Sequence, residues 1–108
     1  MSKPAESKSA VPQELLQFRD RIDSIDEEIL SALARRFEVT ERVGQLKAQH
    51  GLDSVDPVRE QEKLQRLRLS AEQKGLDSSL VHELFQQVFD AVVENHRHLL
   101  AAAKKRGE

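Results

Sequence analysis

Residues 13–50 read QELLQFRDRIDSIDEEILSALARRFEVTERVGQLKAQH, and this stretch decides the fold. Apolar residues recur at seven-residue intervals in two interleaved series: Leu15, Ile22, Ile29 and Val43, and Phe18, Ile25, Ala32, Val39 and Leu46. Such a pattern predicts one helix whose apolar stripe faces another helix. With Pro12 before it and Gly51 after it, the helix should run from about residue 12 to about residue 50. That is far longer than the usual 11–12 or so residues, so a helix alongside is needed to stabilise it.

Two shorter helices are predicted in the rest of the chain. Asp56-Pro57 is typical of an N-cap followed by a first-turn proline, and Gly75 ends this second helix after about Lys74. Asp77 or Ser78 caps the third helix. The side chains expected to face inward are Leu64, Leu67, Ala71, Val81, Leu84, Phe85, Val88, Val92 and Leu99. No strand pattern occurs, so we predict an all-α fold with a disordered tail (1–11), a helical domain (12–103) and a frayed tail (104–108).

Composition narrows the classes of function. The chain has 108 residues, a net charge of -2 and no cysteine. It is long enough for one domain at most, and disulfides and thiolate metal sites are excluded. The negative net charge argues against sequence-independent binding of nucleic acid. No apolar run approaches the roughly 20 residues that span a bilayer, and residues 1–12 carry no apolar signal segment, so we expect no membrane association and a cytoplasmic location.

Arg36 interrupts the first apolar series. A guanidinium cannot lose its proton to escape burial, so it needs an anionic partner. Lys47 follows eleven residues later, about three helical turns, and projects from nearly the same face. Two cations within an apolar stripe suggest a pocket for a small, multiply charged anion. A buried ion pair with another helix, or a side chain that reaches out to solvent, would also explain Arg36.

Arg19 lies on the same predicted helix but on a different face. It precedes Arg36 by seventeen residues, which rotates it by roughly 100° and displaces it by roughly 25 Å. The two residues therefore cannot hold one small ligand from the same helix. Arg19 could serve the pocket of a neighbouring subunit if two long helices pair antiparallel in a symmetric dimer. Spacing alone favours the simpler interpretation, a surface ion pair with Asp23.

Further candidates lie on the second and third helices. Arg59 and Glu60 fall in the first turns after the Asp56 cap, where backbone N–H groups can meet an anion, although a solvated, charged helix end is by itself the simpler explanation. Val92 and His96 are one turn apart, and His96 replaces an apolar residue, so it faces a pocket or caps the core. The histidines lack metal-ligand spacing, and no phosphate-binding loop or nucleophile motif occurs. We therefore expect no metal and no cofactor, and chemistry based on positioning and electrostatics.

Four segments together resemble the all-helical (AroQ-type) chorismate mutases. These segments are LQFRDRIDSID (16–26), LARRFE (33–38), VGQLK (43–47) and DPVRE (56–60). The similarity extends from residue 14 to about residue 100. Each motif alone is weak evidence for the resemblance, but the motifs together, in this order, are strong evidence. The resemblance implies an intertwined helical homodimer in which both chains enclose each active site. It also implies a dianionic substrate, chorismate, and its rearrangement to prephenate.

The resemblance also implies a role for each candidate residue. Arg36 and Arg59 would bind the substrate carboxylates, helped by Arg19 of the other chain. Lys47 would donate to the ether oxygen of the breaking bond, and Glu60, with the backbone near Asp56, would hold the ring hydroxyl. Two positions depart from the family. Val92 stands where relatives commonly carry a small hydroxyl residue. His96 stands where they carry Gln or Glu as a second donor to the ether oxygen.

Two alternatives remain open. An aminodeoxychorismate mutase or an isochorismate pyruvate lyase would use a similar cationic pocket, although Glu60 argues against the lyase, whose relatives tend to be apolar there. A non-catalytic helical dimer module would explain the long helix but not Arg36 and Lys47.

Overall fold

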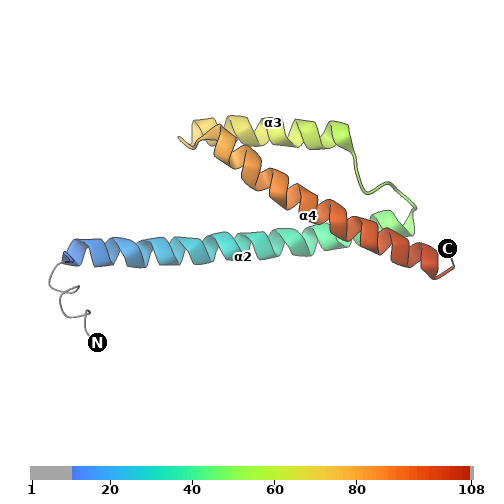
Figure 1. The fold of residues 1–108 in the computed structure, drawn as a ribbon, viewed down its shortest axis with the longest axis horizontal. Coiled ribbons are helices and arrows are strands. Elements are labelled where there is room, and N and C mark those ends of the chain that lie inside the picture. The colour runs from blue at the N-terminus through green and yellow to red at the C-terminus, as the bar shows by residue number, and fades with distance from the viewer. Residues whose placement is uncertain (1–10, 108) are drawn as a thin grey trace. The chain divides into compact units, whose positions relative to one another are not determined.

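The computed structural model describes residues 11–107, and these form three helices. The helices are α2 (Gln13–Gln49), α3 (Pro57–Gln73) and α4 (Ser78–Lys105) (Figure 1). Residues 11–107 contain no β-strand. The predicted all-α fold with a very long first helix is confirmed. The predicted disordered tail, residues 1–11, lies outside the described residues except for its last position.

The helix ends follow from local backbone chemistry. The carbonyl of Pro12 accepts the N–H groups of Leu15 and Leu16 at 3.1 and 3.3 Å, which opens α2. Gly51 adopts a φ of 65°, a conformation that costs glycine little and other residues more. The chain can therefore turn, and the Leu52 N–H caps the Lys47 carbonyl at 2.8 Å.

Two aspartates begin the shorter helices. The Asp56 carboxylate accepts the Arg59 N–H at 3.2 Å, with Pro57 as the first helical residue, so the predicted N-cap of α3 is confirmed. At α4 the sequence left two candidates, and Asp77 is the cap, since its carboxylate accepts the Ser79 N–H at 2.9 Å. α4 continues to Lys105, whereas the sequence placed the start of a frayed tail at residue 104.

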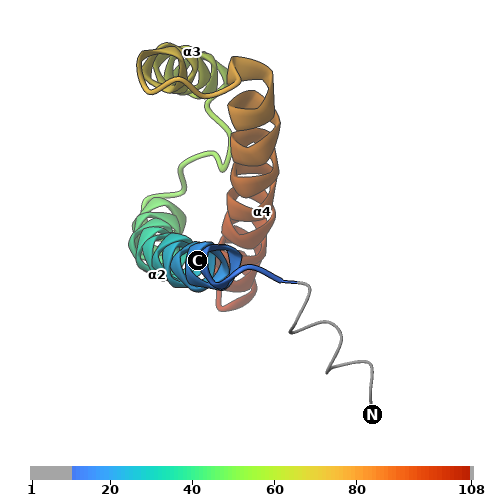
Figure 2. The same cartoon turned by 90° about the vertical axis from the view of Figure 1, so that its left-hand side faces the viewer.

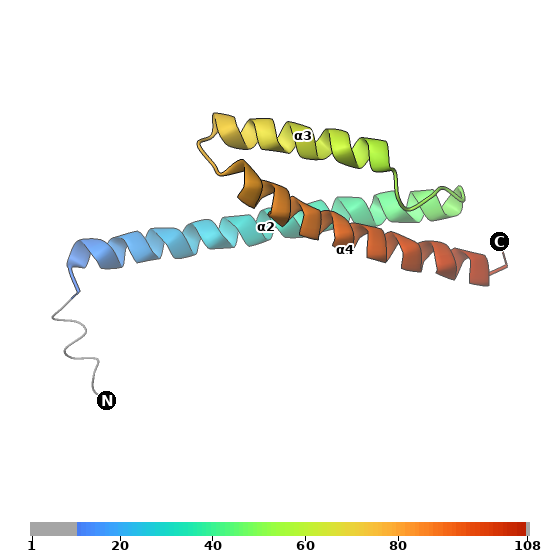
Figure 3. The same cartoon turned by 45° about the horizontal axis from the view of Figure 1, so that its top comes forward.

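The chain divides into two compact units, one ending at Arg36 and the other starting at Phe37. In the second unit α3 and α4 are neighbours joined at residues 74–77 (Figures 2 and 3). Their buried apolar side chains include Leu64, Ala71, Val81 and Phe89. The Phe85 and Phe89 rings meet edge to face, with centroids 6.2 Å apart. This core is small, as expected for a chain in which 33% of the residues are charged.

The predicted core positions are partly correct. Leu64, Ala71 and Val81 are buried as predicted, and Leu67 and Val88 are half-buried. Leu84 was predicted to face inward, but this is wrong, because its side chain is 56% exposed. The sequence analysis missed Phe89, which lies on the buried face of α4, one turn after Phe85.

In the first unit, the apolar stripe of α2 is exposed in the single chain. Ile22, Ile25 and Ile29 are 56%, 51% and 53% exposed, and Phe18 is 46% exposed. Large side chains in such a regular row exceed the scattered apolar residues of an ordinary surface. Across residues 11–107, none of the helices combines the length and apolar character needed to cross a bilayer.

Candidate functional site

α2 carries three of the candidate cations. Lys47 lies in its last turn and is half-buried, beside the capped end of the helix. Arg36 is half-buried and is the last residue of the first unit. Arg19 is exposed, and within residues 11–107 it makes no ion pair with Asp23, the partner that spacing alone favoured. The side chain of Arg19 is therefore available to another group.

The first turn of α3 holds the next group of candidates. Glu60 is half-buried, and Arg59 and Asp56 are exposed. The Asp56 carboxylate caps the Arg59 backbone N–H, so it fixes the turn from which both charged side chains project. Residues 50–56 connect this turn to the end of α2 that carries Lys47, and within that connection Ser54 is buried at 6% exposure.

His96 lies in the contact between α4 and the last turns of α2. It is 4% exposed, and its Nε2 is 2.8 Å from the backbone carbonyl oxygen of Thr40. A carbonyl only accepts hydrogen bonds, so Nε2 is the donor. The sequence left two interpretations of His96, and the structure places the side chain in the core contact. Val92, one turn earlier on α4, is half-buried.

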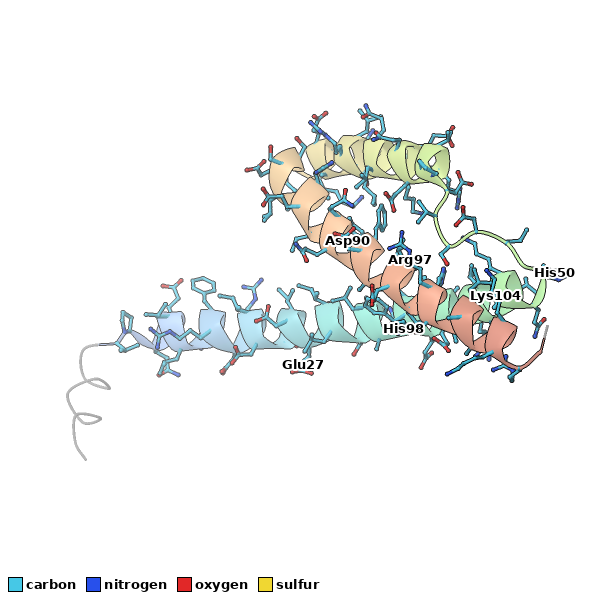
Figure 4. All side chains as sticks on the ribbon, turned by 45° about the vertical axis from the view of Figure 1, so that its right-hand side comes forward. Glu27, His50, Asp90, Arg97, His98 and Lys104 are labelled. Atoms are coloured by element: carbon cyan, nitrogen blue, oxygen red, sulfur yellow. The ribbon has the colours of Figure 1, made fainter. Side chains whose placement is uncertain are left out.

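A second polar contact adjoins His96. The Asn95 amide nitrogen donates to the Glu41 carboxylate at 2.6 Å, and the Gln45 amide donates to the other oxygen of the same carboxylate at 3.2 Å. The sequence analysis did not single out Thr40 or Glu41, because neither departs from the helical pattern. His98, which Figure 4 labels on α4, is exposed. It forms a surface pair with Glu94 at 3.2 Å.

The structure brings some candidates together and leaves others apart. His96 packs against Gly44, which precedes Lys47 by one helical turn. Lys47, Arg59 and Glu60 form no hydrogen bond or ion pair through their side chains with any of residues 11–107. Their charged ends are therefore free to meet a ligand. Two surface hollows lie elsewhere, one lined by residues 80–87 of α4 and one by residues 27–35 of α2, and neither contains a candidate residue.

No described side chains gather into a metal centre. Residues 11–107 contain no group of three or more His, Asp or Glu side chains that could hold a metal ion. What the site offers chemically is a set of cations, one half-buried carboxylate and capped helix ends.

Comparison with known proteins identifies the family. The family model of chorismate mutase type II matches residues 18–97. The chain belongs to the type II chorismate mutase family. This membership confirms the resemblance found in the sequence. All of the candidate residues, from Arg19 to His96, lie within the matched range.

Three relatives from different organisms illustrate the similarity. A chorismate mutase of Methanocaldococcus jannaschii is 31% identical over 74 residues, which cover 68% of this chain and 75% of the relative. The T-protein of Haemophilus influenzae is 38% identical over 73 residues, 68% of this chain and 19% of the relative. A bifunctional chorismate mutase/prephenate dehydratase of Aquifex aeolicus is 33% identical over 94 residues, 83% of this chain and 26% of the relative. The chain spans about a fifth of the length of the T-proteins it matches.

Proposed function

We propose that this protein converts chorismate to prephenate. The observation that carries the proposal is the match of the chorismate mutase type II family model across residues 18–97, with Arg19, Arg36, Lys47 and the Arg59-Glu60 pair in order within it. A relative named as a chorismate mutase and covered over 75% of its length supports the same activity.

The reaction requires that the substrate be held in one geometry and that one developing negative charge be stabilised. Chorismate rearranges by a concerted [3,3] shift in which a C–O bond breaks while a C–C bond forms, without a nucleophile, metal or redox step. The protein must hold the flexible enolpyruvyl side chain over the ring, which removes the entropy of finding that geometry. It must also stabilise the negative charge that grows on the ether oxygen as the C–O bond lengthens.

Each charged residue takes one part of this task. Lys47 donates to the ether oxygen, and its ammonium favours the transition state over the substrate because the oxygen is more negative there. Arg36 and Arg59 bind the two carboxylates of the substrate. Glu60, near the N-terminus of α3, accepts a hydrogen bond from the ring hydroxyl. The free charged ends of Lys47, Arg59 and Glu60 support these roles, because none of them is neutralised by a described residue.

A second copy of the chain completes the site. The exposed row of Phe18, Ile22, Ile25 and Ile29 supports a homodimer in which two α2 helices pair. The roughly 25 Å between Arg19 and Arg36 along the helix then assigns Arg19 to the pocket of the other subunit. In this arrangement each pocket holds Lys47 of one chain and Arg19 of its partner.

Product analysis tests the reaction directly. Purified protein is incubated separately with chorismate, isochorismate and aminodeoxychorismate, and each product is identified by NMR. We expect prephenate from chorismate and little turnover of the other two. Release of pyruvate from isochorismate would instead assign a lyase, and rearrangement of the amino compound alone would assign an aminodeoxychorismate mutase. No turnover of any of the three would support a non-catalytic helical module.

A further inference from the structure

Both ring nitrogens of His96 are withdrawn from solvent. Nε2 donates to the Thr40 carbonyl at 2.8 Å. Nδ1 is buried and has no hydrogen-bond partner among the described residues. A neutral imidazole carries a single N–H, and here the Thr40 carbonyl takes it. Nδ1 is then left as a buried acceptor that carries no proton.

Gly44 makes this packing possible. A Cβ atom at residue 44 would collide with Cδ2 of His96 and would lie 2.9 Å from Nε2 of His96 and 2.8 Å from Cδ1 of Leu99. Glycine weakens a helix interior relative to alanine, so its presence within α2, near the C-terminal end, needs a reason. The close approach of the imidazole to the α2 backbone supplies that reason.

The contact lies next to the turn that carries Lys47. His96 covers Thr40 and Gly44, and Lys47 follows Gly44 by three residues, which places it on the neighbouring turn of the same side of α2. The hydrogen bond from Asn95 to Glu41 ties the same part of α4 to the same part of α2. The two contacts fix both the distance between these helix segments and their rotation.

We propose that His96 is a positioning residue for Lys47 and gives no hydrogen bond to the reacting ether oxygen. The role rests on the proposed chorismate mutase function. His96 docks α4 onto the Thr40–Gly44 turn and thereby holds the direction from which the Lys47 ammonium leaves α2. The position to which the family resemblance would assign a donor to the substrate serves here as a helix-to-helix contact, and Lys47 acts on the ether oxygen without help from His96.

NMR of the imidazole ring tests the proposal at the atom concerned. Long-range proton–nitrogen spectra, with the His96 signals assigned from a His96→Gln sample, distinguish the two neutral tautomers from the doubly protonated ring. At mildly basic pH we expect the Nε2–H tautomer in the free protein. The same tautomer should persist with a bicyclic ether dicarboxylate that mimics the transition state. An Nδ1–H tautomer, or a ring that gains a second proton when the mimic binds, would overturn the proposal.

The same experiment separates this proposal from the proposed function. If the mimic does not bind, the function fails and the positioning role fails with it. In that case the Nε2–H tautomer of the free protein still tests the packing contact by itself. If the mimic binds and the ring becomes a donor to it, the function stands and the positioning role is wrong.

A pair of size-compensating substitutions gives the kinetic test. Gly44→Ala should lower kcat by about 10–100-fold at a temperature where the variant is folded, because a displacement of about 1 Å at the reacting centre costs that much. KM should change little. In a His96→Ala background the space left by the imidazole accommodates the added methyl group and lets the terminal methyl group of Leu99 move aside, so Gly44→Ala should have little further effect. His98→Ala, at an exposed histidine on the same helix, is the matched control and should keep full kcat.

Two kinetic results would contradict the positioning role. One is an equal loss from Gly44→Ala in the wild-type and His96→Ala backgrounds, because the contact would then not be the cause. The other is a lower melting temperature with an unchanged kcat per folded dimer, because His96 would then stabilise the fold without directing Lys47. If Gly44→Ala does not fold, the tautomer measurement decides the proposal.

Discussion

The Lys47→Ala variant is expected to lose at least a factor of about 10²–10³ in kcat on chorismate, the usual cost of removing a donor at a developing oxyanion. Lys47 is the half-buried cation at the end of α2, and no described side chain neutralises it. Its strongest contact with the ether oxygen forms in the transition state, so kcat should fall much more than KM rises.

The control for this prediction is Lys105→Ala, an exposed lysine at the C-terminal end of α4. It removes the same charge and should leave kcat unchanged. Circular dichroism and the mass of the assembly should show that both variants keep the native helix content and oligomeric state. A Lys47→Ala protein that is folded and turns over chorismate at a near-normal rate would show that Lys47 is not the donor to the ether oxygen.

The Ile25→Glu variant is expected to dissociate the proposed dimer and lose activity with it. Ile25 is 51% exposed in the single chain and lies in the middle of the apolar row of α2. Burying the exposed half of an isoleucine contributes about 0.75–1.5 kcal/mol, and a symmetric dimer loses that amount twice. At about 1.4 kcal/mol for each factor of ten, the dissociation constant should rise by about 10–10², before the cost of burying the carboxylates is added.

Ser31→Glu is the matched control, because it adds the same charge to α2 on a face away from the apolar row. Sedimentation at a series of concentrations should show a dimer for the wild type and Ser31→Glu, and a monomer with reduced helix content for Ile25→Glu. A wild-type chain that sediments as a monomer while it turns over chorismate would rule out a site built from two chains.

The ends of the helices could be predicted from the sequence, because capping depends on residues within a few positions of each end. Asp56-Pro57 and Gly51 mark their boundaries within a few residues of backbone, and each was placed correctly. The helical phase of α4 was harder, since Leu84 and Phe85 are adjacent and equally apolar. Only packing against α3 determines that Phe89 is buried and Leu84 is exposed.

The residues of the candidate site likewise fall into those that the sequence reveals and those whose role only the structure reveals. Arg36 and Lys47 could be found from the sequence, because a cation in an apolar series is an exception to a regular pattern. The partner of His96 could not be found, because the Thr40 carbonyl is a backbone group that any residue would supply. Gly44 gave a signal, a glycine within a long helix, but its meaning depends on a side chain that arrives from a distant part of the chain.

Mixing two inactive variants tests the shared site, which is the central claim of this account. Arg19→Ala and Lys47→Ala homodimers should each be nearly inactive. After subunit exchange, verified with two different tags, the heterodimer has one pocket with an intact Lys47 and an intact Arg19 from the partner chain, while the other pocket carries both defects. The account predicts that the purified heterodimer recovers about half of the wild-type activity per dimer, because one of two equivalent sites is restored. Activity that stays at the level of the parent variants after verified exchange would contradict it.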